Sequence, residues 1–352
     1  MKLRTKTKLV LLLIAVNVFT IILNVLARKN VDFANFYSTT IYTAIVNVNA
    51  RISNIFPFSI AELIIVLFIV SVITYLVCMI IKMFKKRQFK RSLSHIGLTL
   101  FLLVTAVFLV FTLTCGINYH RFPFSKYSNL TIEKHNNDDL IKLCNILIED
   151  ANRYVTDDFD EENMEQTAIF AMEKLAKDYP VLKGYYPKAK PVFFSEFMSY
   201  QFICGFYFPF SVESNYNNHM PLVDKPSTIC HELSHLRGFM REDEAEFISY
   251  LACINSDDTY FKYSGTMLAL GYTLNAVHSN CDINIYNELY YKLDSRVVDD
   301  FYESAKYWDQ YRGEIANISN TVNNSYLIMN NQNDGVKSYG RIIDLLLAYY
   351  IK

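Results

Sequence analysis

Three long apolar runs near the N-terminus restrict what this chain can fold into more than any other feature. They cover Leu9–Ala27, Ile60–Ile81 and Ile96–Ile117. A helix rises about 1.5 Å per residue, so roughly 20 residues cross the ~30 Å hydrocarbon core of a bilayer. Soluble helices are seldom apolar on every face over such a length. We therefore expect residues 1–117 to form a membrane anchor of three transmembrane helices, at about 9–27, 60–81 and 96–117.

The distribution of charge predicts how these helices are oriented. Residues 1–117 carry 13 Lys and Arg against 2 Asp and Glu, whereas residues 118–352 carry 21 against 33. The cations cluster before the first run and between the second and third runs: Lys2, Arg4, Lys6, Lys8, Lys82, Lys85, Lys86, Arg87, Lys90 and Arg91. Cytoplasmic loops are rich in Lys and Arg. We expect a multi-pass cell-membrane protein with a cytoplasmic N-terminus and an extracytoplasmic domain at 118–352. Val25-Leu26-Ala27 also fits a signal-peptidase site, and cleavage there would leave two spans and the same final topology.

Residues 118–352 predict a mainly helical domain of the α+β class with a small sheet. Apolar residues recur at helical spacing in Asp138–Tyr154 and Glu161–Tyr179. The runs Pro191–Phe197 and Phe202–Val212 are rich in β-branched and aromatic residues and predict strands. Pro209 places part of the second run at a sheet edge or a strand end.

The rest of the chain predicts helices. They begin at Lys225, break near Asp257, Asn280 and Gly335, and end with a short helix at about Tyr339–Ile351. That last helix is too short to cross a bilayer, so we expect it to pack on the domain.

The sequence His-Glu-Leu-Ser-His at residues 231–235 is the motif that indicates metal binding and catalysis. On a helix, positions four apart share a face, so His231 and His235 can direct two imidazole nitrogens at one ion. Glu232 lies about 100° around the helix from His231, where it can accept a proton from water activated by that ion. Asp224 is a plausible N-cap for this helix, and Pro226 is tolerated in its first turn. The chain has no close pair of cysteines, so a cysteine-based zinc site is unsupported.

A third metal ligand is expected just past the end of this helix. Gly238 can adopt the left-handed conformation that ends a helix. A second helix is then expected over Glu242–Ile254, and catalytic zinc usually takes three protein ligands. Glu242 is our first candidate for the third ligand. Glu246, on the same face, is the alternative, and it could instead orient a ligand histidine.

Two resemblances follow from these residues. The pattern H-E-x-x-H followed by E-x-x-A-E, in which Glu242 and Glu246 stand, resembles the gluzincin branch of the zincin metallopeptidases. The segment Thr228–Cys253 resembles a bacterial membrane family known as domain of unknown function 3810, as do residues 205–210 and 334–341. The first resemblance implies a zincin-like fold, a Zn²⁺ cofactor and hydrolysis of a peptide or protein substrate, with Glu242 as third ligand. The second implies a metallopeptidase role behind a membrane anchor.

Other residues are weaker candidates for contacts with substrate. Zincins commonly bind substrate along an edge strand, for which Gly205 and Tyr207 are the expected residues. Tyr339, His219 or His278 could donate a hydrogen bond to an oxyanion. Each of these also has an ordinary structural interpretation as a core or surface residue.

We therefore expect a membrane-anchored zinc peptidase that acts outside the cytoplasm. A non-catalytic membrane receptor or scaffold with a zincin-like domain is the alternative. The expected partners are the lipid bilayer and a peptide or protein substrate. Nucleic acid is not expected, because residues 118–352 have no basic patch with interleaved aromatics.

Overall fold

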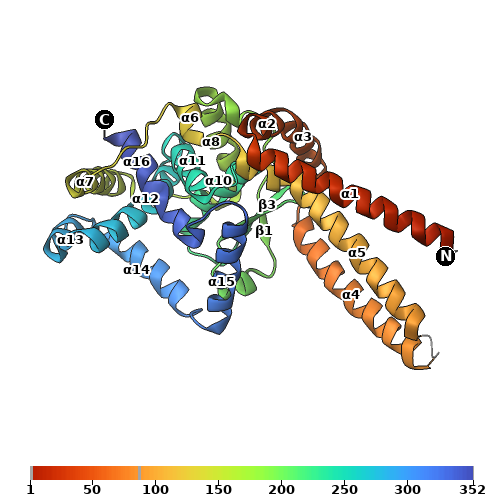
Figure 1. Cartoon of the computed structure of the whole chain (residues 1–352). Helices are drawn as coiled ribbons and strands as arrows, with labels where there is room; N and C mark the ends of the chain where they lie inside the picture. The colour runs from red at the N-terminus through yellow and green to blue at the C-terminus, as the bar shows by residue number, and fades with distance from the viewer. Residues whose placement is uncertain (1–2, 86–88, 352) are drawn as a thin grey trace.

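The computed structural model describes residues 3–85 and 89–351. Lys2, Lys86 and Arg87, which the orientation argument counts, lie outside the described residues. Three long helices project from one side of a helical globular part (Figure 1). The described residues are mainly helical with one three-stranded sheet, which confirms the expected fold class.

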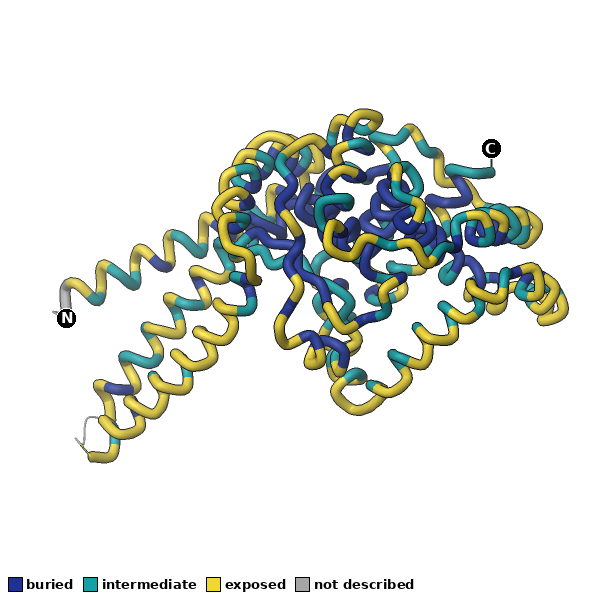
Figure 2. Tube along the Cα trace, turned by 180° about the vertical axis from the view of Figure 1, so that it is seen from behind, coloured by how far each residue is buried: buried dark blue, intermediate teal, exposed yellow. Residues whose placement is uncertain are grey.

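The three long helices are α1 (Leu3–Lys29), α4 (Ile60–Lys85) and α5 (Phe89–Thr114). Each is long and apolar enough to cross a membrane, and Figure 2 shows their surfaces largely exposed. Two asparagines of α1, which are two helical turns apart, donate hydrogen bonds to threonines of α5. These bonds are Asn17 Nδ2 to Thr105 Oγ1 at 2.6 Å and Asn24 Nδ2 to Thr112 Oγ1 at 2.8 Å. They fix the register between the two spans.

Residues 31–53, for which no helix was expected, fold onto the globular part. They form α2 (Val31–Phe36), a single π turn at Tyr37–Ile41 and α3 (Tyr42–Ser53). Tyr42, Val46 and Ala50, spaced four residues apart, are buried in the same core as the motif helix. Because these side chains share one helical face, the segment packs as part of the globular body.

The globular part is built around the helices that carry the motif. Helix α10 (Lys225–Leu236) packs on α11 (Glu242–Ile254), and α11 packs on α12 (Thr259–Asn280). The surrounding helices are α6 (Phe124–Ser128), α7 (Asn137–Tyr154), α8 (Met164–Asp178), α9 (Ser195–Tyr200), α13 (Ile283–Tyr290), α14 (Ser295–Asp309), α15 (Glu314–Met329) and α16 (Ile342–Tyr350). Short 3-10 turns lie at Gly116–His120, Glu161–Asn163, Pro180–Leu182, Leu222–Asp224 and Gly335–Arg341.

The final helix is shorter than expected. A 3-10 turn at Gly335–Arg341 occupies the start of the expected range, and α16 begins only at Ile342. As expected, α16 packs on the globular part, against α7, α11 and α12.

The sheet has the strand order β1-β3-β2. Strand β1 (Lys190–Val192) is parallel to β3 (Glu213–Asn217), and β2 (Gly205–Phe208) is antiparallel to it. The expectation that Pro209 marks a sheet edge or a strand end is confirmed, because β2 is an edge strand and ends at Phe208; the strand is shorter than the expected run Phe202–Val212.

Two details of the expected sheet were wrong. The first expected strand stops at Val192, and Ser195 begins α9, because the backbone amides of Phe193 and Phe194 turn to donate to Glu62. The central strand β3 was missed. Its sequence, ESNYN, has low β propensity, but the neighbouring strands and α10 bury all five of its residues.

Candidate metal centre

Helix α10 brings the two motif histidines to one face. Pro226 lies in its first turn, where a missing backbone N–H costs nothing. Asp224 makes no capping bond, contrary to the expectation, because its carboxylate accepts a hydrogen bond from Ser304 Oγ of α14 at 2.9 Å instead. The helix ends at Leu236, and Gly238 has the expected positive φ, +82°. A side chain at 238 would lie 3.0 Å from Tyr42, so glycine is needed there for space as well as conformation.

The turn at Gly238 returns the chain so that α11 begins at Glu242, against the two histidines. The Nε2 atoms of His231 and His235 are 3.0 Å apart. Glu242 Oε2 is 3.2 Å from His231 Nε2 and 3.4 Å from His235 Nε2. Tetrahedral zinc with bonds of about 2.0–2.1 Å holds its ligand atoms about 3.3 Å apart. A point about 1.9 Å from all three atoms exists in their plane, so these side chains fit a zinc ion.

Further contacts hold the three side chains in this arrangement. The carbonyl oxygen of Phe239 lies 2.8 Å from His235 Nδ1 and accepts a hydrogen bond from it. His231 Nδ1 lies 3.4 Å from Glu246 Oε2, and Tyr272 donates to the other oxygen of Glu246 at 3.1 Å. When Nδ1 of each imidazole is protonated, Nε2 is free to bind a metal. Glu246, the alternative third ligand, therefore lies behind His231 and outside the group of three facing atoms.

Carboxylates dominate the electrostatics of this cluster. Burial favours neutral imidazoles, but Glu246 and Glu242 outweigh it and raise the pKa of His231 well above its usual value. Burial would likewise raise the pKa of Glu242, yet the two histidines lower it to about 2. Two carboxylates buried beside two imidazoles make a site that favours a cation.

Glu232 is buried next to the cluster without being one of the three facing groups. Its Oε2 atom has no hydrogen-bond partner in the described part of the chain. Burial raises the pKa of Glu232 to about 7, although the two histidines act in the opposite direction. A carboxyl group with that pKa can both accept and release a proton near neutral pH.

The edge strand β2 packs directly on Glu232 through Gly205. A Cβ atom at position 205 would lie 2.7 Å from Glu232 Oε1 and 2.9 Å from Thr228 Cγ2. Strand β2 is therefore close to the candidate centre, and only glycine allows its backbone to approach so closely.

Tyr207, also on β2, makes structural contacts. Its hydroxyl donates to the carbonyl oxygen of Thr114, the last residue of α5, at 3.2 Å. Tyr42 OH lies 3.2 Å from the same hydroxyl and 3.2 Å from the carbonyl oxygen of Leu236. These contacts tie the end of a membrane-spanning helix to the end of the motif helix. The spacing of apolar residues in α3 is the one sequence signal that could have indicated Tyr42.

The segment after α15 covers the other side of the centre. Gln332 Oε1 accepts a hydrogen bond from the backbone amide of Glu242 at 3.2 Å. Tyr339 lies close enough to Glu242 and Glu246 that, after burial, these carboxylates are the main cause of its raised pKa. Tyr339 therefore stays protonated at neutral pH. Sequence reasoning missed Gln332, for which no motif provides a signal.

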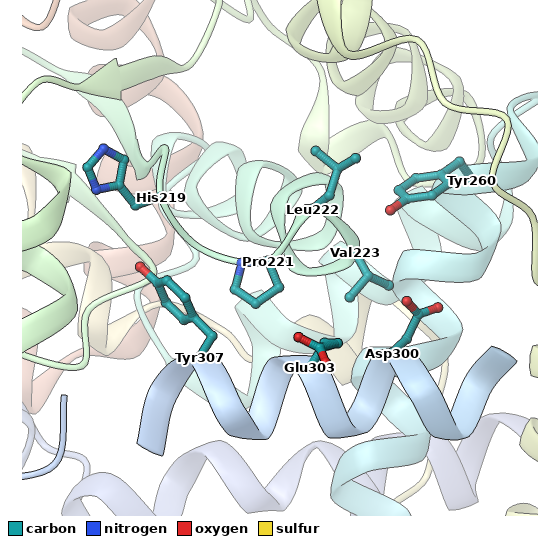
Figure 3. A pocket seen from close by; sticks show the side chains of 8 residues that line it. All are labelled: His219, Pro221, Leu222, Val223, Tyr260, Asp300, Glu303 and Tyr307. Carbon is teal, nitrogen blue, oxygen red and sulfur yellow. The ribbon is translucent and has the colours of Figure 1, made fainter. Parts of the chain in front are cut away.

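The other two histidines considered for an oxyanion lie outside the three-ligand cluster. His278 lies at the end of α12, where its ring contacts Tyr286. His219 lines a surface pocket with Tyr260, Asp300 and Tyr307 (Figure 3), and none of the metal-ligand candidates lines that pocket. Among the described residues, the one group of side chains placed to hold a metal is His231, His235 and Glu242.

Comparison with known proteins places this chain in a family. The profile described as Protein of unknown function (DUF3810) matches residues 37–347. The chain belongs to this family. The region of the DUF3810 match covers α3, two of the three membrane-spanning helices and the whole candidate centre. No curated protein and no solved structure matches the chain.

Proposed function

We propose that this DUF3810 protein is a membrane-anchored, zinc-dependent metallopeptidase whose globular part acts outside the cytoplasm. The observation that carries the proposal is the triangle formed by His231 Nε2, His235 Nε2 and Glu242 Oε2. Its edges of 3.0, 3.2 and 3.4 Å match the ligand spacing of tetrahedral zinc. The resemblance to gluzincins supports the same assignment, as does the clustering of Lys and Arg on the opposite side of the spans.

The residues of the chain have distinct roles in this proposal. A bound zinc ion would polarise the carbonyl group of a peptide bond and make water a stronger acid. Glu232, whose Oε2 has no hydrogen-bond partner among the residues that the structure describes, accepts a proton from water and delivers it to the leaving amine. Tyr339, protonated at neutral pH, donates a hydrogen bond to the oxygen that gains charge. The edge strand β2 offers its free backbone groups to an extended peptide substrate.

Metal content and peptide cleavage by the purified full-length protein test this proposal. We expect one equivalent of zinc in the wild type and in Glu232→Gln, and none in His231→Ala. We expect cleavage of a mixed peptide library, followed by mass spectrometry, from the wild type alone among these three. His278→Ala is the matched control, because it removes a histidine remote from the site, and it should keep both zinc and activity.

Two outcomes would contradict the proposal. Equal cleavage by Glu232→Gln and the wild type would remove Glu232 from the chemistry. One equivalent of zinc without cleavage of any peptide would favour the alternative, a non-catalytic receptor or scaffold.

A further inference from the structure

Exposed phenylalanines gather where the globular part meets the start of helix α4. Phe193, Phe194 and Phe197, in and after the turn that follows β1, are 82%, 54% and 61% exposed. Phe56 and Phe58, in the loop before α4, are 40% and 49% exposed. A soluble surface rarely gathers so many exposed aromatic rings without a partner.

The turn after β1 is fixed to the first turn of α4 by hydrogen bonds. The Glu62 carboxylate accepts the backbone amides of Phe193 at 3.0 Å and Phe194 at 2.8 Å. An acidic residue inside a membrane-spanning helix is costly unless it is paired, and these two donors satisfy it. The exposed phenylalanines therefore sit at the level of Glu62 in the span.

Glu62 lies at the level where the hydrocarbon core ends. Lys82 is in the last turn of the same helix, near its other end. At about 1.5 Å per residue, Glu62 and Lys82 are roughly 30 Å apart along the helix, which is the thickness of the hydrocarbon core. With Lys82 at one boundary of the bilayer, Glu62 and the attached phenylalanines lie at the other.

The sheet is joined rigidly to the same end of α4. The carboxylate of Glu213 in β3 accepts the backbone amides of Ile60 at 3.2 Å and Ala61 at 2.8 Å, the first amides of the helix. Ser59, just before the helix, donates to Asn215 of β3 at 2.6 Å. These bonds satisfy amides that a helix N-terminus leaves unpaired, so the turn after β1 cannot swing away from the span independently.

Helix α15 presents a second apolar surface at the end of another span. Ile315, Ile318 and Val322 recur at helical spacing and are 48%, 62% and 63% exposed. Arg28, at the end of α1, donates to the carbonyl oxygen of Met329 at 3.3 Å. In Figure 1, α4 and α5 extend downward from the globular part, and α15 and the segment around β1 lie in the lower part of that globular region.

We propose that these two apolar surfaces rest in the outer interface of the lipid bilayer. We call them together the interfacial surface: Ile55, Phe56, Phe58, Phe193, Phe194, Phe197, Ile315, Ile318, Val322 and Met329. The occupant is lipid because both parts of the surface are hydrogen-bonded to the ends of membrane-spanning helices: Phe193 and Phe194 to Glu62 of α4, and Met329 to Arg28 of α1. Aromatic side chains are enriched at this depth of a bilayer.

The interfacial surface places the candidate metal centre close to the membrane. Strand β2 runs from Gly205, in contact with Glu232, to Phe208, which pairs with the capping residue Glu213. Three steps along a strand span about 10 Å. The centre therefore lies one short strand away from the residue that caps α4.

The single tryptophan of the chain, Trp308, makes a direct depth measurement possible. In a full-length Trp308→Phe background, we would introduce Phe194→Trp, Phe197→Trp or Ile318→Trp one at a time. Tyr291→Trp is the matched control, because Tyr291 is 86% exposed and follows α13, which lies at the far end of the globular part from the spans (Figure 1). Each protein is reconstituted into phosphatidylcholine vesicles with or without bromine on the acyl chains.

We expect brominated lipid to quench the three test positions at least about twofold more strongly than the control, because aromatic rings at the interface contact acyl chains. Acrylamide in the aqueous phase should show the opposite order. Quenching by brominated lipid no stronger than at Tyr291→Trp would overturn the proposal. Protection from both quenchers would also overturn it and would indicate a protein partner, such as a second copy. None of these measurements depends on zinc or on peptide cleavage, so they stand apart from the proposed function.

Discussion

Replacing Gly205 with alanine tests how closely the edge strand must approach Glu232. The new Cβ would lie 2.7 Å from Glu232 Oε1, 2.8 Å from its Cγ and 2.9 Å from Thr228 Cγ2. Ordinary van der Waals contact begins at 3.4 Å, so either β2 must move by about 0.7 Å or both Glu232 and Thr228 must shift. Overpacking of this kind costs about 1–3 kcal/mol of stability.

The same displacement has a larger effect on chemistry than on folding. A misplacement of about 1 Å in a reacting group can lower the rate about 100-fold. We therefore expect Gly205→Ala to lower kcat/KM by roughly 10- to 100-fold on a peptide that the wild type cleaves. Zinc content should stay at one equivalent, because Glu232 is not one of the three facing groups.

Gly313→Ala is the matched control for this substitution. A Cβ at 313 meets nothing within 4 Å, and its φ of 168° is extended backbone that any residue adopts. It should leave thermal unfolding and kcat/KM unchanged. The reasoning is refuted if Gly205→Ala unfolds at the wild-type temperature and keeps wild-type kcat/KM.

Three further predictions concern single side chains. Tyr42→Phe removes the hydroxyl that bonds the carbonyl oxygen of Leu236, so we expect a loss of about 1 kcal/mol in chemical denaturation. Burial raises the pKa of Asp224 from 3.8 to about 6, so folding favours its protonated form. This contribution to stability is full below pH 3.8 and is lost as the pH rises through about 6, so Asp224→Asn should make the pH dependence of thermal unfolding less steep over that interval. Glu246→Gln should weaken zinc binding by about 10- to 100-fold in a chelator competition, because Glu246 orients His231.

Each of these has a result that would contradict it. Unchanged stability of Tyr42→Phe would show that water replaces the hydroxyl. A pH dependence as steep in Asp224→Asn as in the wild type would assign it to other groups. Complete loss of zinc in Glu246→Gln, with retention in Glu242→Gln, would exchange the roles of the two glutamates.

The elements that the sequence predicted well are those defined by local periodicity. Helix α11 begins at Glu242 and ends at Ile254, as the acidic first turn and apolar face predicted. The positive φ of Gly238 followed from the need to end one helix and start another. The three spans followed from their length and apolar composition. In each of these cases neighbouring residues carry the signal.

The elements that the sequence did not predict depend on partners distant in the chain. Polar residues make up most of strand β3, and two of them pair with a segment some 150 positions earlier: Glu213 accepts the first amides of α4, and Asn215 accepts from Ser59 just before that helix. Residues 31–53 belong to the globular core because Tyr42 reaches the end of α10. The strand predicted after Pro191 was cut short because Glu62 of a span binds its backbone.

The sequence by itself determined which residues could bind a metal, since the side-chain chemistry and the four-residue spacing of His231 and His235 are local properties. Only the tertiary structure distinguishes the positions of Glu242 and Glu246, which share one face of α11: Glu242 faces Nε2 of both histidines, whereas Glu246 approaches Nδ1 of His231. The tertiary structure alone also placed Gly205 against Glu232 and fixed the turn at Phe193 and Phe194 to the first turn of α4. Packing and hydrogen bonds between distant segments set those positions, and no local pattern encodes them.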